Sequence, residues 1–504
     1  MGNLIEERLR LILKKRYVLV LFPILFLILD SLVFILPYYL NGYTIPVGWD
    51  TAWYIHNMQL IREQGLYPFF IKTHGINLFC ILEYLFASAF NISFMLTATI
   101  VPIMLSLLFP LVNFQIVRRS TASWKLSLVA MAFTIVDYNI VRMTVDLHRN
   151  LFCLLLSQVA VFLILPRLLE KASKKDFFIF VSLMAMAGLS QVETFAVVMA
   201  ILFLSSIFYI KKHFLDASKL LWLCIITPTL MVIFIQAPLL PIFAEGHMVL
   251  NPAVSPYRQN FVAQPWSYLE SLGAGLIPLY VIGLHCLLKE LSENFASRQH
   301  LLISFWNFVV IIGSFLPLFG VRVPGWRVLL LTTFPPVATM GFAKLFSKKS
   351  SITKKKLIAL TVLLTLSLAT IIASQTRSYR PWISEENYER LVWIGNENQN
   401  NSCIFVLCLN MSPGWAELYR NWIWAVIGTK TNVYFGNIES LLQSKPTRFE
   451  DPYLNLTSSI FWDDFENFTL DEANIYLIEE WYNLTLDNEN LEKVPHDGIY
   501  RVKH

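Results

Sequence analysis

Two short polar stretches interrupt long apolar runs and carry the residues best suited to chemistry. Residues 47–56 (VGWDTAWYIH) contain Asp50, and residues 141–149 (VRMTVDLHR) contain Asp146. A carboxylate can take a proton from a reacting group, and two convergent carboxylates can hold a divalent cation such as Mg²⁺ or Mn²⁺. We therefore predict that Asp50 and Asp146 are catalytic residues that converge from two loops, either to bind a cation or to position an acceptor.

The residues after Asp50 have helical periodicity as far as Gln64. The apolar positions are Trp53, Ile55, Met58, Leu60 and Ile61. This pattern predicts an amphipathic helix at a membrane surface. Asp50 would stand at the start of that helix, where it could serve only as the N-cap. Capping and a catalytic role can coexist, and both interpretations stay open.

Three further positions are candidates because ionisable groups near apolar runs are often functional. Glu193 lies at the junction of two apolar runs and is a third catalytic candidate, although it could equally be a solvated loop residue. Glu83 lies inside the short apolar run 76–90, and an interfacial helix could leave it in water. We take Glu83 as a secondary candidate, together with His148 and Arg149 from the second polar stretch.

Arginines in two later loops suggest anion binding. Residues 320–327 (GVRVPGWR) contain Arg322 and Arg327, and the long loop 244–266 contains Arg258. A guanidinium group binds phosphate through paired hydrogen bonds, so we predict a phosphate-binding role for these three arginines. Arg322 and Arg327 could instead reach lipid headgroups.

The elements that carry these residues are predominantly apolar. Of 504 residues, 56% are hydrophobic and only 15% are charged. This composition excludes a disordered protein and an ordinary soluble enzyme over most of the length. Runs about 20 residues long predict a polytopic α-helical membrane protein. The runs are 17–40, 95–117, 124–141, 148–166, 176–191, 192–211, 220–242, 268–288, 301–320, 326–346 and 355–374.

Charges between the runs predict how the chain is oriented. Lys and Arg concentrate before residue 17 and in alternate loops, so the N-terminus is expected in the cytoplasm. This pattern fits about eleven spans and a C-terminal region on the outside, provided that the short run 76–90 lies at the outer surface. The polar stretches around Asp50, Asp146, Glu193 and Arg327 would then share the outer side.

The composition changes after residue 375, where apolar runs shorten to the length of strands. Runs at 403–409, 431–436, 474–480 and 498–502 predict strands, and 385–397 and 413–426 predict helices. We therefore expect two domains, a membrane domain at 1–375 and a small extracytoplasmic α/β domain at 376–504. Five Asn-x-Ser/Thr sequons in the second region agree with an exterior location.

Several classes of function lack support in the sequence. It has no Walker motif, no GxGxxG and no Ser-His-Asp pattern. Its six cysteines show no zinc-site spacing. The net charge of +5 is small and lies mostly in short loops, so it indicates topology and not a nucleic-acid partner.

Taken together, these motifs resemble the integral-membrane GT-C glycosyltransferases. That superfamily has an acidic residue early in the first outer loop, as in Gly-Trp-Asp50-Thr-x-x-Tyr54, and an Asp in an Arg-rich second outer loop, as in Arg142-x-x-x-Asp146. Arg322 and Arg327, before a Pro-containing span, are similar to the late arginine that contacts the donor phosphate. Residues 73–77 (THGIN) depart from the His-Pro-Pro pattern of the superfamily. No Trp-Trp-Asp motif is present, which favours the mannosyl- and aminoarabinose-transferase branch over the oligosaccharyltransferases.

The resemblance implies a hexosyl- or pentosyltransferase of the cell envelope. Its donor would be a polyprenyl- or dolichyl-phosphate sugar, its acceptor a glycan, lipid or protein, and its location a prokaryotic plasma membrane. Asp50 would act as the base in an inverting transfer, with Asp146 and Glu193 in support. Arg322 and Arg327 would hold the leaving phosphate. The alternative is a flippase, transporter or assembly subunit for lipid-linked glycans, in which the same arginines bind phosphate without chemistry.

Overall fold

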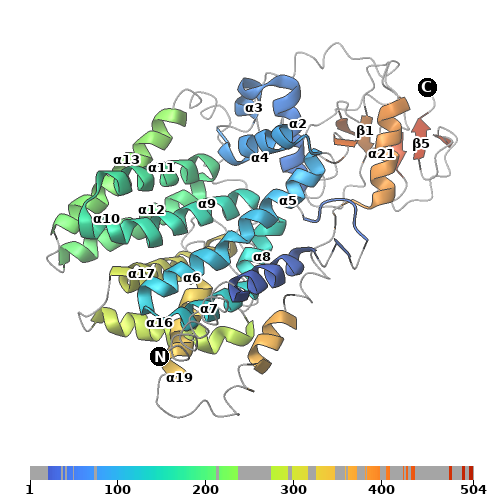
Figure 1. Ribbon diagram of the computed structural model, residues 1–504. Helices are drawn as coiled ribbons and strands as arrows, with labels where there is room; N and C mark the ends of the chain where they lie inside the picture. Colours follow the sequence, from blue (N-terminus) through green and yellow to red (C-terminus); the bar gives the residue numbers. More distant parts are fainter. Residues whose placement is uncertain are drawn as a thin grey trace, which may run out of the picture.

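The computed structural model is a bundle of α-helices with a smaller helix-and-strand region at one end (Figure 1). It describes residues 21–35, 38–39, 42–48, 50–72, 76–211, 215–236, 274–292, 298–315, 325–346, 358, 361–369, 371, 381, 383–397, 405–408, 424, 427–428, 433–436, 476–478, 491–493 and 499–502.

Helices follow one another closely along the first half of the chain. An apolar helix, Leu21–Ile35, comes first. It is followed by α2 (Thr51–Gln64), α3 (Leu66–Lys72), α4 (Leu78–Phe90), α5 (Phe94–Ser106), α6 (Leu108–Thr121), α7 (Trp124–Ile135), α8 (Tyr138–Val145), α9 (His148–Gln158), a π-helical turn (Val159–Ile164), α10 (Leu165–Lys171), α11 (Lys174–Ser190), α12 (Val192–Lys211) and α13 (Leu215–Gln236).

The second half of the bundle consists of shorter helices. They are a 3₁₀ turn (Ala274–Leu276), α16 (Ile277–Ser292), α17 (Arg298–Gly313), α18 (Gly325–Leu329) and α19 (Phe334–Phe346). Polar side chains set several helix starts in the bundle. Ser93, Ser123 and Ser173 each accept a hydrogen bond from a backbone N–H in the first turn of α5, α7 and α11.

Four helices in the described chain are long and apolar enough to cross a membrane. They are Phe94–Thr121, His148–Lys171, Val192–Ile210 and Leu215–Gln236. The pair α7 and α8, bent by 48°, is a fifth if it counts as one span. The predicted polytopic α-helical fold is therefore confirmed. The count of about eleven spans and the orientation stay predictions, because several predicted spans extend beyond the described residues.

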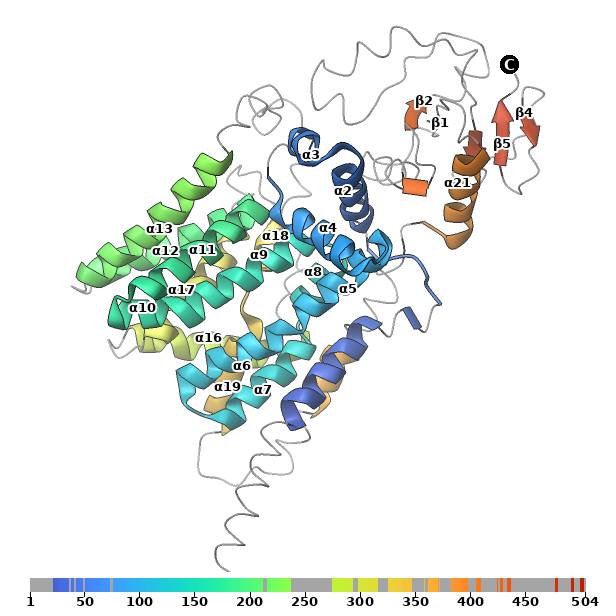
Figure 2. The ribbon, with the colours of Figure 1, turned by 45° about the horizontal axis from the view of Figure 1, so that its top comes forward.

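The short apolar run at 76–90 forms the 13-residue helix α4. Its N-cap Asn77 accepts a hydrogen bond from the backbone N–H of Cys80, and Asn91 ends the helix in the left-handed conformation. Figure 2 shows α2, α3 and α4 gathered at one end of the bundle. A helix of 13 residues rises only about 20 Å, too little for a full span.

Two helix breaks face each other inside the bundle. One lies between α7 and α8, where Asp137 caps α8, and the other lies between α18 and α19. Across them, the side-chain amide of Asn139 donates to the hydroxyl of Thr332 at 2.7 Å. The amide of Asn307 donates to the hydroxyl of Thr333 at 2.6 Å. Buried polar groups in an apolar interior need internal partners, so these amide and hydroxyl groups bind one another.

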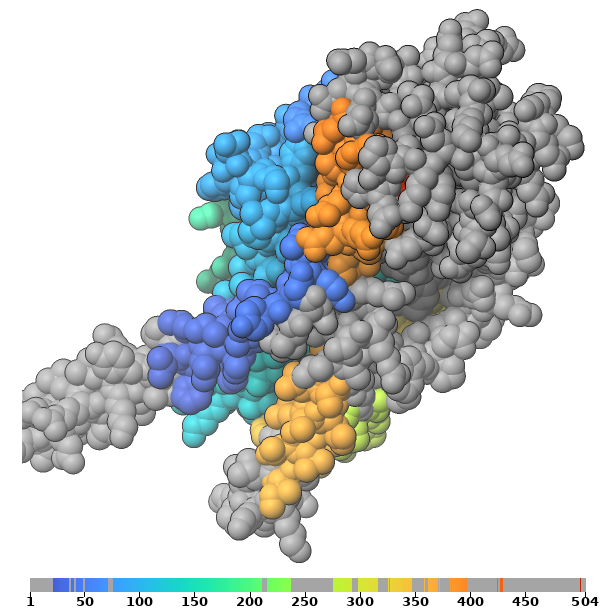
Figure 3. Space-filling view, turned by 90° about the vertical axis from the view of Figure 1, so that its right-hand side faces the viewer, coloured from blue at the N-terminus to red at the C-terminus, as the bar shows by residue number. Residues whose placement is uncertain are grey.

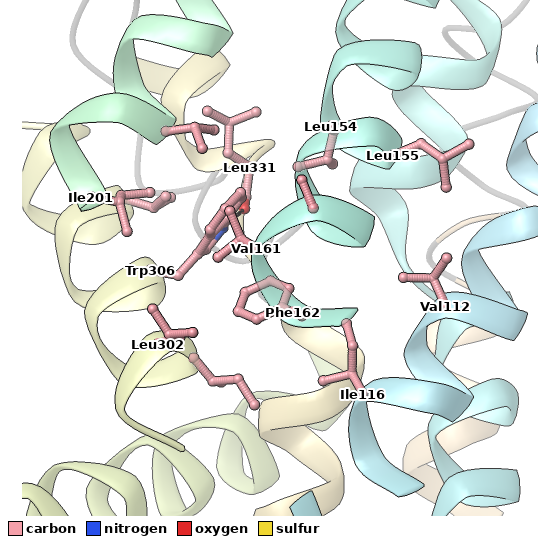
Figure 4. Close-up of a cluster of buried hydrophobic side chains, with 14 of the residues drawn as sticks. Val112, Ile116, Leu154, Leu155, Val161, Phe162, Ile201, Leu302, Trp306 and Leu331 are labelled. Carbon is pink, nitrogen blue, oxygen red and sulfur yellow. Dashed lines mark hydrogen bonds between the residues drawn. The ribbon is translucent and has the colours of Figure 1, made fainter. Parts of the chain in front are cut away.

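The centre of the bundle packs around the π-helical turn and α17 (Figure 4). Phe162 lies against Trp306, with 5.1 Å between ring centroids, and the Trp306 indole N–H donates to the carbonyl of Leu331 at 2.6 Å. A π turn shifts the ladder of backbone hydrogen bonds. The side-chain amide of Gln299 donates a hydrogen bond to the carbonyl oxygen of Phe162 at 3.0 Å. The packing therefore fixes an irregular segment without leaving that carbonyl unpaired.

Beyond the bundle, α21 (Glu385–Glu397) accompanies five short strands. Strands β1 (Phe405–Cys408) and β2 (Val433–Gly436) pair in parallel, with Phe405 opposite Val433. Strands β3 (Tyr476–Ile478), β4 (Leu491–Lys493) and β5 (Ile499–Val502) form an antiparallel sheet in the order β3-β5-β4. The predicted helix 385–397 and the four predicted strands are all present, and β4 was not predicted. The predicted helix 413–426 lies outside the described residues, apart from residue 424. The domain boundary at residue 375 stays a prediction.

This C-terminal region packs directly on the helices that follow the first polar stretch. Ile383, Leu391 and Ile394 share an apolar cluster with residues of α2, α4 and α5. Figure 3 shows α21, in orange, against these blue N-terminal helices. The cluster buries most of α2, including Ala52, Ile55 and Met58. Trp53, His56 and Gln59 on another side of α2 are only half-buried, so the expectation that α2 lies at a membrane surface stays a prediction.

Close contact between α16 and α19 gives a test of the fold. A Cβ atom on Gly283 would lie 1.9 Å from the carbonyl oxygen of Val337, and one on Gly341 would lie 1.9 Å from that of Leu279. Small residues allow helices to approach in a membrane. We expect Gly283→Ala to destabilise the protein by about 1–3 kcal/mol, measured as a lower melting temperature in detergent.

The matched control is Gly313→Ala. Its Cβ would meet only a side-chain methyl of Val328, at 3.2 Å, so the neighbour can adjust. Equal melting temperatures for the two variants would contradict the close helix crossing.

Candidate functional site

The first polar stretch lies directly on the end of α8. Gly48 has φ +121°, a conformation that favours glycine, and a Cβ atom there would lie 2.1 Å from the carbonyl oxygen of Val145. The buried Thr51 hydroxyl lies 2.9 Å from the carbonyl oxygen of Val47 and 3.2 Å from that of Val145, and can donate to either. Residues 47–51 are therefore held against the end of α8 by backbone contact.

This contact brings the two predicted carboxylate residues together as an acidic pair, Asp50 and Asp146. The backbone N–H of Asp50 donates to Asp146 Oδ1 at 3.4 Å. Asp146 is 4% exposed, and its Oδ2 lies 2.9 Å from Arg142 Nη2. A buried carboxylate needs a cation or hydrogen bonds. Asp146 has both, so it can hold residue 50 in place.

Asp50 occupies the N-cap position of α2 without acting as a cap. Its side chain makes no capping hydrogen bond to the first turn. Capping therefore does not account for an acidic residue here. Asp50 is half-buried, and its backbone N–H meets the buried Asp146, so this residue stands at the protein surface, as a base that reaches a substrate would require.

A second contact between the same elements lies about one helical turn further along. Trp53 follows Asp50 by three residues, and Arg149 follows Asp146 by three. The Arg149 guanidinium lies over the Trp53 ring, 4.4 Å from its centroid, and we call these two residues the arginine–tryptophan pair. The backbone N–H of Arg149 donates to the Tyr54 hydroxyl at 3.2 Å. Arg149, a secondary candidate, thus lies next to the acidic pair.

His148 and Glu83 lie behind these contacts, away from solvent. The Tyr54 ring stacks on His148, with 4.3 Å between centroids, and Phe79 meets Tyr54 edge-on. His148 Nδ1 lies 3.7 Å from Glu83 Oε1, and Glu83 is 0% exposed. Burial raises the pKa of Glu83 well above its usual range, which favours the neutral carboxylic acid. Glu83 is therefore not left in water, as it could be on an interfacial helix, because α2 and α9 cover this part of α4.

Glu193 and Arg327 meet each other at a separate place. Arg327 Nη1 in α18 lies 3.8 Å from Glu193 Oε2 in the first turn of α12. Both are partly exposed, and such ion pairs are weak. The side-chain amide of Asn150 donates to the hydroxyl of Thr194 at 2.9 Å, which links α9 to this part of α12. Glu193 is therefore near the second polar stretch but is paired with a predicted phosphate-binding residue.

The remaining predicted residues, Arg258 and Arg322, lie outside the described residues. Within the described chain, no three His, Cys, Asp or Glu side chains gather as a metal site would need. Sequence reasoning did not assign a role to Gly48, Trp53 or Arg142. Of these, only the role of Arg142 could have been predicted from spacing, because residues four apart are neighbours on a helix and Arg142 precedes Asp146 by four.

Gly48 allows a direct test of the loop contact. We expect Gly48→Ala to push residues 47–51 away from Val145, because a Cβ cannot occupy a position 2.1 Å from an oxygen. Hydrogen exchange of the amides at 142–150 should become faster.

Gly65→Ala is the matched control. Gly65 also has positive φ, at +85°, but nothing lies within 4 Å of its Cβ position. It therefore carries the same kind of backbone strain, about 1 kcal/mol or more, without the collision. If both variants left exchange at 142–150 unchanged, the contact would not exist in solution.

Comparisons with known proteins agree with this architecture at the level of fold. No protein-family model matches the sequence, and no curated protein matches it. The chain is similar in structure to the oligosaccharyltransferase of Archaeoglobus fulgidus tethered to an acceptor peptide, with a TM-score of 0.58 and 11% identity. The aligned part covers 83% of this chain and 64% of that one.

Two other structures of that archaeal enzyme give a similar result. One holds an inhibitory peptide and a dolichol-phosphate (TM-score 0.52, 11% identity, 83% of this chain and 64% of that one). The other holds zinc and sulfate (TM-score 0.52, 12% identity, 82% and 62%). The chain thus spans less than two thirds of the archaeal enzyme. At this identity the likeness shows the fold alone, so the preference for the mannosyl- and aminoarabinose-transferase branch stays a prediction. The predicted polytopic α-helical fold thus agrees with the fold of this archaeal membrane enzyme, and the glycosyltransferase superfamily stays a prediction.

Proposed function

We propose that this protein transfers a sugar from a polyprenyl-phosphate-linked donor to an acceptor at the outer face of the membrane. The observation that carries the proposal is the acidic pair. Asp50 and Asp146, from separate polar stretches, meet at one end of a helical bundle whose fold is similar to that of the archaeal oligosaccharyltransferase. A half-buried carboxylate there is placed to act as a base between lipid and water.

The proposed reaction inverts the anomeric carbon in one displacement. The Asp50 carboxylate takes the proton of the acceptor hydroxyl while the acceptor oxygen forms its bond to that carbon. The bond from the carbon to the phosphate oxygen breaks, and the phosphate leaves with the bonding electrons. Asp146, fixed by Arg142, acts as a positioning residue because it binds the backbone of Asp50.

The leaving phosphate would need cations on the side opposite the base. Arg327 supports this role because its ion pair with Glu193 is long and partly exposed, so a phosphate can replace the carboxylate. We propose that Arg322 and Arg258 act with it. Glu193 then acts as a counter-ion that holds Arg327 until the donor binds, and not as the base.

A divalent cation fits this acidic pair. Mg²⁺ and Mn²⁺ are commonly held by one or two carboxylates, with water and substrate as the other ligands. Asp50 and Asp146 would hold the ion, which would supply positive charge for an anionic substrate. The archaeal enzyme has been crystallised with zinc. Asp50 and Asp146 are the two acidic residues that this contact brings together, and such a donor set suits an exchangeable Mg²⁺ or Mn²⁺.

The partners and location follow the same proposal. The archaeal enzyme binds a dolichol-phosphate and an acceptor peptide. For this chain we propose a polyprenyl- or dolichyl-phosphate sugar as donor, in a prokaryotic plasma membrane with a cytoplasmic N-terminus. Contacts connect α2, α9, α12, α18 and α21 at one end of the bundle, which supports an outer position for the C-terminal region.

Asp50→Asn tests the proposed chemistry. An amide cannot take the proton, so we expect a loss of about 100-fold or more in transfer. Glycans of cells that lack the protein should miss one sugar by mass spectrometry. The wild-type gene should restore that sugar, and a well-expressed Asp50→Asn should not.

Asp216→Asn is the control for this experiment. Its carboxylate is fully exposed and pairs only loosely with Lys219, at 3.6 Å, so this variant should restore the sugar. Full restoration by Asp50→Asn would sink the transferase proposal and favour the flippase or assembly alternative.

Binding of Mn²⁺ tests the cation. We expect chelator-washed protein to bind Mn²⁺ and Asp146→Asn to bind it about tenfold more weakly or worse, as measured by electron paramagnetic resonance. Asp176→Asn is the matched control, because Asp176 also pairs with an arginine, Arg167, at 2.8 Å. Equal affinities for wild type and Asp146→Asn would remove Asp146 from the cation site.

A further inference from the structure

We propose that Arg149 recognises an acidic acceptor, one that carries a carboxylate or phosphate about one helical turn from the hydroxyl that receives the sugar. The inference rests on the proposed function and names the class of acceptor. It comes from the arginine–tryptophan pair, whose charge the described protein does not neutralise.

The neighbouring arginines differ from Arg149 in this respect. Arg142 is paired with Asp146 at 2.9 Å and Arg327 with Glu193 at 3.8 Å. No carboxylate of the described chain lies within ion-pair distance of Arg149. Its Nε atom is buried and has no hydrogen-bond partner there. A half-buried guanidinium without an anion is costly, so a bound anion would stabilise it.

The guanidinium is also held in one orientation. Its face lies on Trp53, 4.4 Å from the ring centroid, and the backbone N–H of Arg149 is fixed by Tyr54. Tyr54 in turn stacks on the buried His148. With one face covered and Nε buried, the outer edge formed by the two Nη atoms is left for a ligand. A guanidinium edge matches the two oxygens of a carboxylate or phosphate.

The position of Arg149 places this anion on the acceptor and not on the leaving group. In an inverting displacement, the base and the leaving phosphate stand on opposite sides of the anomeric carbon. Trp53 follows the proposed base, Asp50, by one turn on the same face of α2. Arg149, stacked on Trp53, is therefore on the side of the base. One helical turn is about 5.4 Å, roughly the separation of a ring hydroxyl from the acidic group of a uronic acid or a sugar phosphate.

Binding of three simple probes to the full chain in nanodiscs tests this inference. The probes are methyl β-D-glucuronide, glucose 6-phosphate and methyl β-D-glucoside, followed by saturation-transfer NMR. We expect at least one anionic probe to bind wild type about tenfold more tightly than the neutral glucoside, and Arg149→Gln to remove that difference. The comparison of glucuronide with phosphate identifies which anion the site prefers.

Two variants control for charge and for folding. Arg62→Gln removes an arginine that also lies over an aromatic ring, Phe94 at 5.0 Å, but is exposed and paired with Glu63. It should bind every probe as wild type does. Arg149→Lys keeps the charge without the planar edge, so it should fold and show an intermediate affinity for the anionic probe.

The inference is overturned if wild type binds all three probes alike, or if Arg149→Gln keeps the preference for an anion. Either result leaves the proposed function standing as long as Asp50→Asn still abolishes the sugar in cells. The opposite result is also informative. If the protein in nanodiscs prefers an anion through Arg149, but cells that lack the protein have unchanged glycans, then Arg149 binds an anion and the proposed sugar transfer is wrong.

Discussion

The approach of residues 47–51 to the end of α8 is the contact on which the rest of the site depends. Gly48 lets two backbones meet where any larger residue would collide with Val145. The Thr51 hydroxyl lies within hydrogen-bonding distance of the carbonyl oxygen of Val145. Only then can the Asp50 N–H reach Asp146 and Trp53 reach Arg149. The acidic pair and the arginine–tryptophan pair are thus consequences of one close contact between two chain segments. A change at Gly48 should disturb both pairs together.

The bundle beneath holds this contact on helices that are broken inside an apolar interior. Broken helices are costly in an apolar interior unless each freed group finds a partner. The Asp137 carboxylate accepts from the backbone N–H of Asn139 where α8 leaves the direction of α7 by 48°, and the Asn307 side-chain oxygen accepts from the backbone N–H of Thr333. The bend between α7 and α8 therefore helps to position the site.

The sequence was sufficient to predict those elements whose formation depends on residues close together in the chain. The periodicity after Asp50 predicted α2, the run 385–397 predicted α21, and the apolar length of 76–90 predicted a helix too short to span. The break at Val136 and Asp137 was not predicted, because neighbouring apolar residues hide it within one run. The burial of Glu83 and the stacking of Arg149 on Trp53 depend on elements far apart in sequence. No spacing along the chain encodes them.

The C-terminal region bears on the chemistry through the same segment that carries Asp50. Gly48 forms a parallel bridge with Pro381, and the Thr44 hydroxyl donates to Glu385 in α21. Ile383, Leu391 and Ile394 then pack against the apolar side of α2. Since α2 carries both Trp53 and the N-cap Asp50, the C-terminal region fixes the orientation of the helix that presents the proposed base.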